Sequence, residues 1–385
     1  LTGEALKIGL VSPWNDCCGV AVHAWLVGSA WLRMGHELVV FAPIDERLKG
    51  RLPVDAPDEP FVIRCWEMYQ HGDRLEDDGI LGLYLDPRPL LEEDFDVLFV
   101  EKPCSTPLGK LMKLMHWLKR KGPVVAVMHA GIVPRLRSFY RAEWDAAALF
   151  DERFYRLYGH VIKARRLAII PYPFHPVKVG DKEVARRELG LPSDVEIVLA
   201  FGVRAKHLWP LMPYIAHLAE RRDLKLLILA EHGEGLKHAL ALRKRYDFVE
   251  VRREAPHYEA LYAYLHASDA VVLHRPPADY VPISSTVHLC LGAMRPLLCP
   301  DNNFFEVYDG AVVKYSGPED FAEKLEAVLD GDTLVDEALR KAKLMVDENR
   351  PEKIAEELLE LALDGVGDVS SGVNVGTLAR ASRAV

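Results

Sequence analysis

The sequence lacks the patterns that define several other classes of protein. No apolar run reaches the roughly 18 uninterrupted residues of a membrane-spanning helix, so no integral membrane protein is predicted. The six cysteines form no CxxC pair and have no histidine at zinc-site spacing. The first residues do not resemble a signal peptide, and a cytoplasmic location is therefore expected. A formal net charge of −9 argues against nucleic acid as a partner.

The dinucleotide-binding fingerprint G-x-G-x-x-G is also absent. The loop before the first expected helix contains one glycine, Gly19. That fingerprint needs several glycines so that the backbone can turn tightly and approach a pyrophosphate. A dehydrogenase is therefore not predicted.

The sequence does contain an alternation of buried strands and helices. The run LKIGLVSPW, residues 6–14, is apolar and ends in polar residues, which is typical of a strand buried on both faces of a parallel sheet. Residues 20–32 repeat apolar positions at helical spacing, Gly35 follows as a helix stop, and residues 38–41 form a second apolar run. Similar alternation follows at residues 95–131, so a doubly wound α/β domain is predicted.

A second domain of the same kind is predicted after a proline-rich segment, residues 169–180. Apolar runs then alternate with helical segments at residues 196–202, 224–232, 247–251, 269–275 and 295–300. The expected architecture is two Rossmann-like domains, 1–172 and 173–365, that face each other across a cleft, with a Gly/Ser-rich tail at 366–385. Residues 171–176 are the expected hinge.

These segments resemble the retaining GT-B glycosyltransferases of family GT4. The similarity runs in order through SPWNDCCGVAVHAWLVGSAWLRMGHELVVFAP, VVAVMHAG, AIIPYPFHP, LGLPSDVEIVLAFGVRAKHLW and YEALYAYLHASDAVVLHRPP, and covers residues 6–350. The resemblance implies that a hexose moves from a GDP- or UDP-linked sugar to a saccharide or lipid-linked acceptor with retention of anomeric configuration. It also implies that the donor binds to the second domain and the acceptor mainly to the first.

The resemblance further implies chemistry without a metal or another cofactor. In metal-dependent glycosyltransferases of the other fold, a DxD motif follows a strand. Here the DFD of residues 94–96 precedes the apolar run at 97–100, so it is expected at the wrong edge of the sheet to bind a catalytic metal.

One feature of the family is missing. Its members carry two glutamates, eight positions apart, around the last ligand-binding helix, one near the donor sugar and one on the nucleotide ribose. Alignment on GAMRPLLC places Val281 and Leu289 at those positions. Asp279 and His288 are the nearest polar substitutes, and both are expected to bind the donor. The donor is therefore held differently here, or is unusual, or catalysis is impaired.

A hydroxyl-rich helix start is the first candidate donor site. Ser284, Ser285 and Thr286 follow the helix-breaking Pro282. Free N–H groups and the positive end of the helix dipole bind anions, and hydroxyls add donors without charge. A diphosphate suits such a site, whereas a carboxylate there would repel it. Ordinary helix capping by serine is the alternative interpretation.

Three further residues are candidates for a catalytic role. Arg204 and Lys206 follow an apolar strand and would neutralise a leaving diphosphate. The family has a similar pair with wider spacing, and a solvated loop is the alternative. His129 ends the strand VVAVMHAG, where the family's histidine contacts the donor sugar. A purely structural histidine is the alternative for this position.

Weaker candidates surround these. Gly19 would let the backbone approach the donor, and Asn15 or Asp16 would contact sugar hydroxyls on the acceptor side, unless this loop is a plain tight turn. Arg252 and Arg253 follow the strand DFVEV, where the family meets the nucleobase, and guanidinium groups can stack on a base. Two ordinary surface arginines are the alternative.

A basic amphipathic segment, KLMKLMHWLKRK, begins at Lys110 and ends at Lys121. Such a helix can lie on anionic lipid and present the cleft to a membrane-bound acceptor, which would make the protein peripheral at the inner membrane face. The alternative is a helix that covers its domain and exposes a solvated basic face.

Two other functions are compatible with the sequence. A non-catalytic nucleotide-sugar binding protein would explain the missing glutamates. A UDP-sugar epimerase of the same architecture would need acid and base carboxylates in the cleft, and the sequence does not place them.

Overall fold

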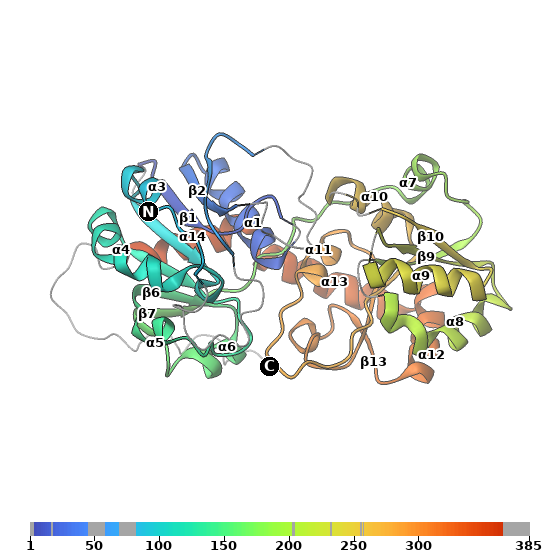
Figure 1. Cartoon of the computed structure of the whole chain (residues 1–385). Coiled ribbons are helices and arrows are strands. Elements are labelled where there is room, and N and C mark those ends of the chain that lie inside the picture. The colour runs from blue at the N-terminus through green and yellow to red at the C-terminus, as the bar shows by residue number, and fades with distance from the viewer. Residues whose placement is uncertain are drawn as a thin grey trace.

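Two α/β lobes lie side by side along the long axis of the molecule (Figure 1). The computed structural model describes residues 4–16, 18–44, 58–68, 82–201, 205–231, 233–254, 256 and 258–364. Each lobe is built on one sheet whose paired strands are all parallel, with the orders β3-β2-β1-β4-β5-β6-β7 and β10-β9-β8-β11-β12-β13. Both lobes thus have the predicted fold class.

The first lobe holds the first sheet and the helices around it. Its strands are β1 (Lys7–Val11), β2 (Glu37–Pro43), β3 (Val62–Trp66), β4 (Val97–Glu101), β5 (Val124–Val127), β6 (Glu143–Leu149) and β7 (Lys163–Ile169). Its described helices are α1 (Gly19–Arg33), α3 (Arg88–Glu92), η3 (Pro103–Ser105), α4 (Leu108–Lys121), α5 (Arg137–Arg141) and α6 (Glu152–Tyr158).

The second lobe repeats the arrangement on a smaller sheet. Its strands are β8 (Glu196–Phe201), β9 (Leu224–Leu229), β10 (Val249–Arg252), β11 (Ala270–Val272), β12 (Leu297–Pro300) and β13 (Val313–Tyr315). Its described helices are α7 (Lys182–Leu189), η4 (Ala205–Leu211), α8 (Met212–Ala219), α9 (Gly233–Arg245), α10 (Tyr258–Ala267), α11 (Ser285–Gly292), η5 (Glu306–Tyr308), α12 (Pro318–Leu329) and α13 (Thr333–Glu348).

Local sequence signals account for the ends of the helices that matter for the site. The Sγ atom of Cys18 caps α1 by accepting a hydrogen bond from the backbone N–H of Ala21 at 3.4 Å. The expected stop, Gly35, has φ +89°, a left-handed conformation that glycine adopts without steric cost. The helix α1 therefore starts at the carboxyl edge of the first sheet and ends just before β2.

The last helix, α14 (Pro351–Leu363), returns to the first lobe. Its residues Ile354 and Leu358 belong to the hydrophobic core of the first sheet, and its Ala355 carbonyl accepts a hydrogen bond from Trp31 Nε1 of α1 at 3.0 Å. The expected second domain, 173–365, thus includes a helix that packs on the other sheet. The chain crosses between the lobes twice, once after β7 and once before α14.

The expected hinge is a packed segment. Its residues 172–175 are buried, and the backbone N–H groups of Phe174 and His175 donate to the carbonyls of Asn349, at 3.0 Å, and His288, at 3.2 Å. The two crossings are therefore hydrogen-bonded to each other, because Asn349 immediately precedes the return to α14. Motion at residues 171–176 remains a prediction.

The DFD segment lies where the sequence predicted. Asp96 precedes β4, and its carboxylate accepts a hydrogen bond from the backbone N–H of Lys7, the first residue of β1, at 2.7 Å. It therefore stabilises the amino edge of the first sheet, opposite the carboxyl edge where ligands bind to open α/β sheets. Among the helices described, none is both long and apolar enough to span a bilayer.

Candidate functional site

A cleft of about 220 Å³ lies between the two lobes at the carboxyl edge of the first sheet. The first lobe contributes the residues that follow β1, β3, β4 and β5, and the second lobe contributes the loop before α11 and the first residue of that helix. The lining residues are Pro13, Cys18, Gly19, Val20, Trp66, Met68, Glu101, Lys102, Ser105, His129, Gly131, Tyr172, Tyr280, Val281, Ile283 and Ser285.

Two helix starts meet in this cleft. A Cβ atom added to Gly19, the first residue of α1, would lie 3.3 Å from the Oγ atom of Ser285, the first residue of α11. Helix N-termini carry unpaired N–H groups and a partial positive charge, so two of them side by side favour an anion. The predicted residues Gly19 and Ser285 are thereby brought together.

Ser284 occupies the N-cap position of α11 without capping it. Its backbone has φ −111° and ψ 91°, and its side chain makes no capping hydrogen bond. Its Oγ atom is buried and has no hydrogen-bond partner among the described residues. Its backbone N–H and carbonyl both lie 3.4 Å from the hydroxyl of Tyr308. Thr286 is half-buried in the first turn of α11. Ordinary side-chain capping therefore does not explain this serine.

A buried carboxylate forms the floor of the cleft. Glu101, the last residue of β4, accepts a hydrogen bond from His23 Nδ1 at 2.9 Å and another from His129 Nε2. The side chains of Glu101 and His23 are buried, and that of His129 is 5% exposed. Among the described lining residues, Glu101 carries the only carboxylate.

The protonation states in this cluster follow from burial and charge. Burial raises the pKa of Glu101, but the nearby imidazoles of His23 and His129 outweigh it and hold that pKa at about 2. Burial lowers the pKa of His129 to about 4, against the opposing attraction of Glu101. Near neutral pH an ionised Glu101 therefore faces a neutral His129, whose Nε2 carries the proton and whose Nδ1 keeps a lone pair.

This cluster is also the candidate metal site of the described residues. The ligand atoms of His23, Glu101 and His129 all lie within 4.8 Å of one another. Two imidazoles and one carboxylate are a donor set that zinc accepts. However, both nitrogens already donate to the carboxylate, so each ring would have to lose that hydrogen bond and present a lone pair. The geometry therefore fits a hydrogen-bonded triad better than a metal site.

An aromatic layer links the cluster to the second lobe. Tyr172, in the linker, packs 5.2 Å from the ring of His23 and 4.7 Å from the ring of His288, between ring centroids. Its hydroxyl donates to the carbonyl of Gly19 at 2.6 Å. Tyr172 therefore fixes the start of α1 against the linker.

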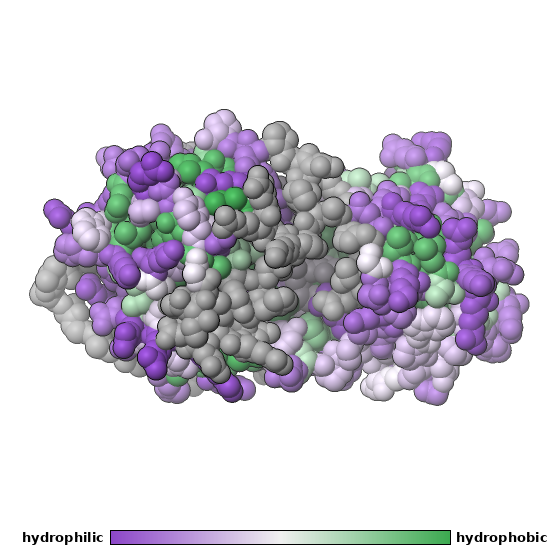
Figure 2. Space-filling view, in the orientation of Figure 1, coloured by the Kyte–Doolittle hydropathy of each residue, from purple (hydrophilic) through white to green (hydrophobic). Residues whose placement is uncertain are grey.

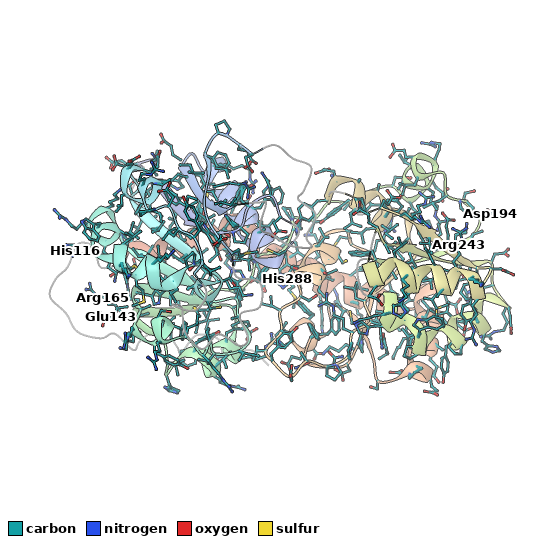
Figure 3. The ribbon with its side chains drawn as sticks, in the orientation of Figure 1. His116, Glu143, Arg165, Asp194, Arg243 and His288 are labelled. Atoms are coloured by element: carbon teal, nitrogen blue, oxygen red, sulfur yellow. The ribbon has the colours of Figure 1, made fainter. Side chains whose placement is uncertain are left out.

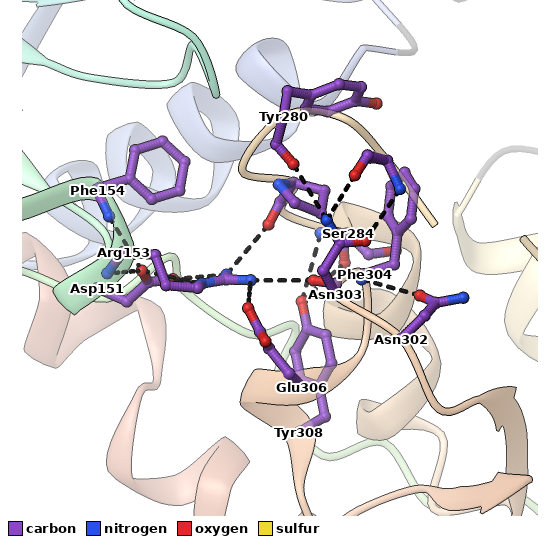
Figure 4. A network of polar contacts seen from close by, with 12 residues as sticks. Asp151, Arg153, Phe154, Tyr280, Ser284, Asn302, Asn303, Phe304, Glu306 and Tyr308 are labelled. Atoms are coloured by element: carbon purple, nitrogen blue, oxygen red, sulfur yellow. Dashed lines mark hydrogen bonds and ion pairs between the residues drawn. The ribbon is translucent and has the colours of Figure 1, made fainter. Parts of the chain in front are cut away.

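A polar network joins the lobes beside the cleft (Figure 4). Arg153 in α6 is held by Asp151, which also caps that helix. The same guanidinium donates to three groups of the second lobe: the carbonyl of Pro282 at 3.1 Å, the carbonyl of Asn303 at 3.0 Å and Glu306 Oε1 at 2.8 Å. Arg153 thus anchors the loop that leads into α11.

His288 does not line the cleft, so its expected contact with the donor remains a prediction. Its ring is stacked on Phe174 with centroids 3.9 Å apart, and its Nδ1 lies 3.1 Å from the carbonyl of Pro173. Burial lowers its pKa to about 3. In Figure 3 the His288 label lies where the two lobes meet, but the residue does not line the cleft. Helical spacing placed His288 on α11 but could not show that this face packs on the linker.

Asp279, the other expected substitute for the glutamates, and the two arginines expected to contact the nucleobase also lie away from the cleft lining. Asp279 is exposed. Arg252 donates to Glu250 Oε1 at 3.0 Å and to the Tyr264 hydroxyl at 3.1 Å, on the edge strand of the second sheet. Arg253 is exposed beside it. None of the three is among the described residues that line the cleft.

Of the two positions that carry glutamate in the resembled family, one faces the cleft. Val281 lines it and donates its backbone N–H to the carbonyl of Gly131 at 3.0 Å. Leu289 is buried in the core of the second lobe. The cleft wall at Val281 is therefore apolar, and the close contact at Gly131 leaves no space for a Cβ atom there.

The remaining predicted residues divide between the first and second lobes. Asn15 has φ +52° and donates to Asp58 and Glu59, so its amide faces a neighbouring loop rather than the cleft. Asp16 is buried and does not line the cleft. Lys206 is exposed in η4, beyond the carboxyl end of β8.

Arg204 lies outside the described residues. The expected grip of Arg204 and Lys206 on a diphosphate therefore remains a prediction.

Comparison with solved structures establishes the fold. No family model matches the sequence. Sucrose-phosphate synthase from Thermosynechococcus elongatus is similar over 92% of this chain and 98% of its own, with TM-score 0.64 and 17% identity. A glycosyltransferase from Rickettsia africae matches over 94% and 100%, with TM-score 0.61 and 13% identity. An E. coli structure described as trehalose-6-phosphate bound with UDP-2-fluoro glucose matches over 92% and 98%, with TM-score 0.55 and 11% identity. The chain has the GT-B fold.

Proposed function

We propose that this protein is a glycosyltransferase that moves a hexose from a nucleotide-diphosphate sugar to an acceptor. The observation that carries the proposal is the meeting of the α1 and α11 starts in a cleft between two Rossmann-like lobes, with Gly19 and Ser285 in contact distance. Unpaired N–H groups from both helices can bind the donor diphosphate without a metal. The GT-B fold supports this assignment by analogy only.

In the proposed arrangement the nucleotide lies on the second lobe and the acceptor on the first. Arg204 and Lys206 add positive charge for the departing diphosphate, which lowers the barrier to breaking the glycosidic bond. The E. coli neighbour bound with UDP-2-fluoro glucose favours UDP over GDP as the nucleotide to test first. Transfer occurs with retention of configuration.

His129 orients the donor sugar as a hydrogen-bond acceptor. Glu101 fixes the tautomer by accepting from Nε2, so the free Nδ1 can accept from a sugar hydroxyl. Because the pKa of His129 is about 4, the imidazole stays neutral at the pH of the cell. The histidine therefore contributes positioning rather than positive charge, and the diphosphate is stabilised by the helix starts and the cations.

Turnover and binding assays test the proposal together. Purified protein is incubated with UDP- and GDP-hexoses and panels of saccharide and lipid-linked acceptors, with and without a chelator, and the anomeric configuration of the product is measured by NMR. We expect chelator-insensitive transfer with retention. Binding without transfer or hydrolysis would instead support a nucleotide-sugar binding protein, and conversion of the free UDP-sugar into its epimer would support an epimerase.

The acceptor side of the proposal includes contact with an anionic membrane surface through α4. Leu111 and Leu118 of this helix are buried against the first sheet. The outer face exposes Lys110, Lys113, Trp117 and Arg120, and 52% of Trp117 is exposed. Cations flanking an exposed tryptophan are suited to a lipid headgroup layer. The described surface of both lobes is otherwise largely hydrophilic in the view of Figure 2.

A further inference from the structure

A lysine without a partner lies in the cleft wall. Lys102 follows Glu101 directly at the end of β4 and lines the cleft. Among the described residues, none forms a hydrogen bond or an ion pair with the Lys102 ammonium. Its backbone has φ +45°, a left-handed conformation that costs a side-chain-bearing residue about 1–2 kcal/mol. No described residue of β4 itself has a positive φ, so this conformation occurs only where the strand ends at the cleft.

A buried hydroxyl without a partner lies three residues further on. Ser105 lines the same cleft and is 5% exposed, and its Oγ atom has no hydrogen-bond partner in the described part of the chain. Leaving a buried hydroxyl unpaired costs about 1–3 kcal/mol. A group that enters the cleft and accepts a hydrogen bond from Ser105 would remove that cost.

The loop that carries both residues is fixed by its own backbone. The N–H of Lys102 donates to the carbonyl of Val127 in β5 at 2.9 Å, and the N–H of Ser105 donates to the carbonyl of Lys102 at 2.8 Å. The Thr106 hydroxyl donates to the carbonyl of Pro103 at 2.7 Å. These bonds satisfy the backbone of the turn but leave the Lys102 ammonium and the Ser105 hydroxyl available.

The electrostatic surroundings favour an anion. The sequence contains no aspartate or glutamate between Glu101 and Glu143. The carboxylate closest along the chain, Glu101, already accepts hydrogen bonds from His23 and His129 and is directed at them. Among the described residues Lys102 forms no ion pair with this carboxylate, so its ammonium can bind an anion that enters the cleft.

We propose that Lys102 and Ser105 form a binding site for an oxyanion, a phosphate or a carboxylate, carried by the acceptor. The ammonium supplies charge and hydrogen bonds, and the hydroxyl supplies one oriented donor. The part of this proposal that assigns the oxyanion to the acceptor rests on the proposed function. The donor diphosphate is assigned to the helix starts at Gly19 and Ser285, whereas the Lys102 loop belongs to the first lobe, on which the acceptor binds. The substrate class that follows is an anionic acceptor.

Inorganic phosphate is the probe for this site. Its binding is measured from the rise in melting temperature of the full chain on titration, with and without saturating UDP, for the wild type, Lys102→Gln, Ser105→Ala and Lys102→Arg. Lys244→Gln is the matched control, because Lys244 is exposed on α9 of the other lobe. Any general stabilisation by phosphate affects all variants equally, so only differences between them are interpreted.

We expect the phosphate dissociation constant to rise at least ten-fold in Lys102→Gln and several-fold in Ser105→Ala. Lys102→Arg and Lys244→Gln should bind like the wild type. Saturating UDP should leave the difference in phosphate affinity between the wild type and Lys102→Gln unchanged, because the two anions occupy different positions. Melting temperatures without ligand show whether each variant has folded.

Two results would overturn the proposal. Equal phosphate affinity in Lys102→Gln and the wild type would show that this lysine binds no oxyanion. Loss of the difference between the wild type and Lys102→Gln when UDP is saturating would assign Lys102 to the donor diphosphate instead. The readout needs no turnover, so a failed search for transferase activity would reject the proposed function without changing the result for this site.

Discussion

At the scale of single residues, Glu101 organises the candidate site. A buried carboxylate is costly unless hydrogen bonds and charge compensate it, and here two imidazole N–H groups do so. The sequence predicted His129 because it follows a buried strand at the ligand edge. It did not single out Glu101, although an acid that ends the apolar run VLFVE is a usable signal. His23 had no such signal, because it lies within an apolar helix and its partner is 78 positions away.

Replacement of Glu101 by glutamine tests its positioning role. The glutamine amide has one carbonyl oxygen to accept from an imidazole and an NH₂ group that cannot accept, so His129 or His23 must change tautomer or lose its partner. We expect kcat to fall at least ten-fold with a smaller change in donor KM, and unfolding to become easier by about 1–3 kcal/mol. Steady-state kinetics and thermal melts measure the two effects separately.

A variant as active as the wild type would show that Glu101 acts on stability alone. Glu143→Gln is the control, because Glu143 is exposed at the start of β6 (Figure 3) and should change neither kcat nor KM.

Three buried histidines predict acid sensitivity of the fold. Burial lowers the pKa of His129 to about 4, of His175 to about 4 and of His288 to about 3. Each folded-state pKa lies below the value of about 6.5 expected in the unfolded chain, so the unfolded chain binds protons first as pH falls. The stability contributed by their neutral forms is complete above pH 6.5 and is lost progressively as pH falls towards 4.

The expected slope is on the order of 1 kcal/mol per pH unit for each histidine within that window. Denaturant unfolding between pH 7.5 and pH 4.5 measures it. His288→Gln should flatten the curve, whereas substitution of the exposed His217 by glutamine should leave it unchanged. Stability independent of pH in the wild type would contradict the lowered pKa values.

At the scale of elements, the strongly apolar strands were predictable from the sequence, whereas strands that contain charged residues or many alanines were not. The strands β1, β4, β5, β8 and β9 are mainly apolar, and all appear near their expected positions. The structure adds β6, whose sequence EWDAAAL is rich in alanine, and β7, whose sequence KARRLAI carries charges because it is the edge strand. The packing of α14 on the first sheet depends on tertiary contacts that no local pattern encodes.

The Arg153 network predicts how the loop before α11 is held. Arg153→Ala removes the hydrogen bonds to the carbonyls of Pro282 and Asn303. Asp151 loses its ion pair but still caps the start of α6. The start of α11 would then be less well ordered, and donor binding would have to order it. We expect donor KM to rise several-fold with little change in kcat. Arg165→Ala, on the exposed edge strand β7, is the matched control and should change neither constant.

At the scale of the whole molecule, α4 belongs to the first lobe, which forms one wall of the cleft. The predicted membrane contact is tested by sedimentation with vesicles of neutral lipid alone or with added anionic lipid. We expect binding to anionic vesicles that weakens at high salt. The triple variant Lys110→Ser, Lys113→Ser and Trp117→Ala should lose this binding without losing turnover on a water-soluble acceptor. Equal binding to neutral vesicles would contradict an electrostatic contact.

The central claim is that a nucleotide diphosphate binds between the starts of α1 and α11. The most direct test compares UDP and GDP affinity in Ser285→Glu and Ser285→Gln, which differ in charge but hardly in size, by isothermal titration calorimetry. A carboxylate at this position would face the diphosphate at close range. The account predicts that the nucleotide bound by the wild type binds at least ten-fold more weakly to Ser285→Glu than to Ser285→Gln. Equal affinity for the two variants would contradict it.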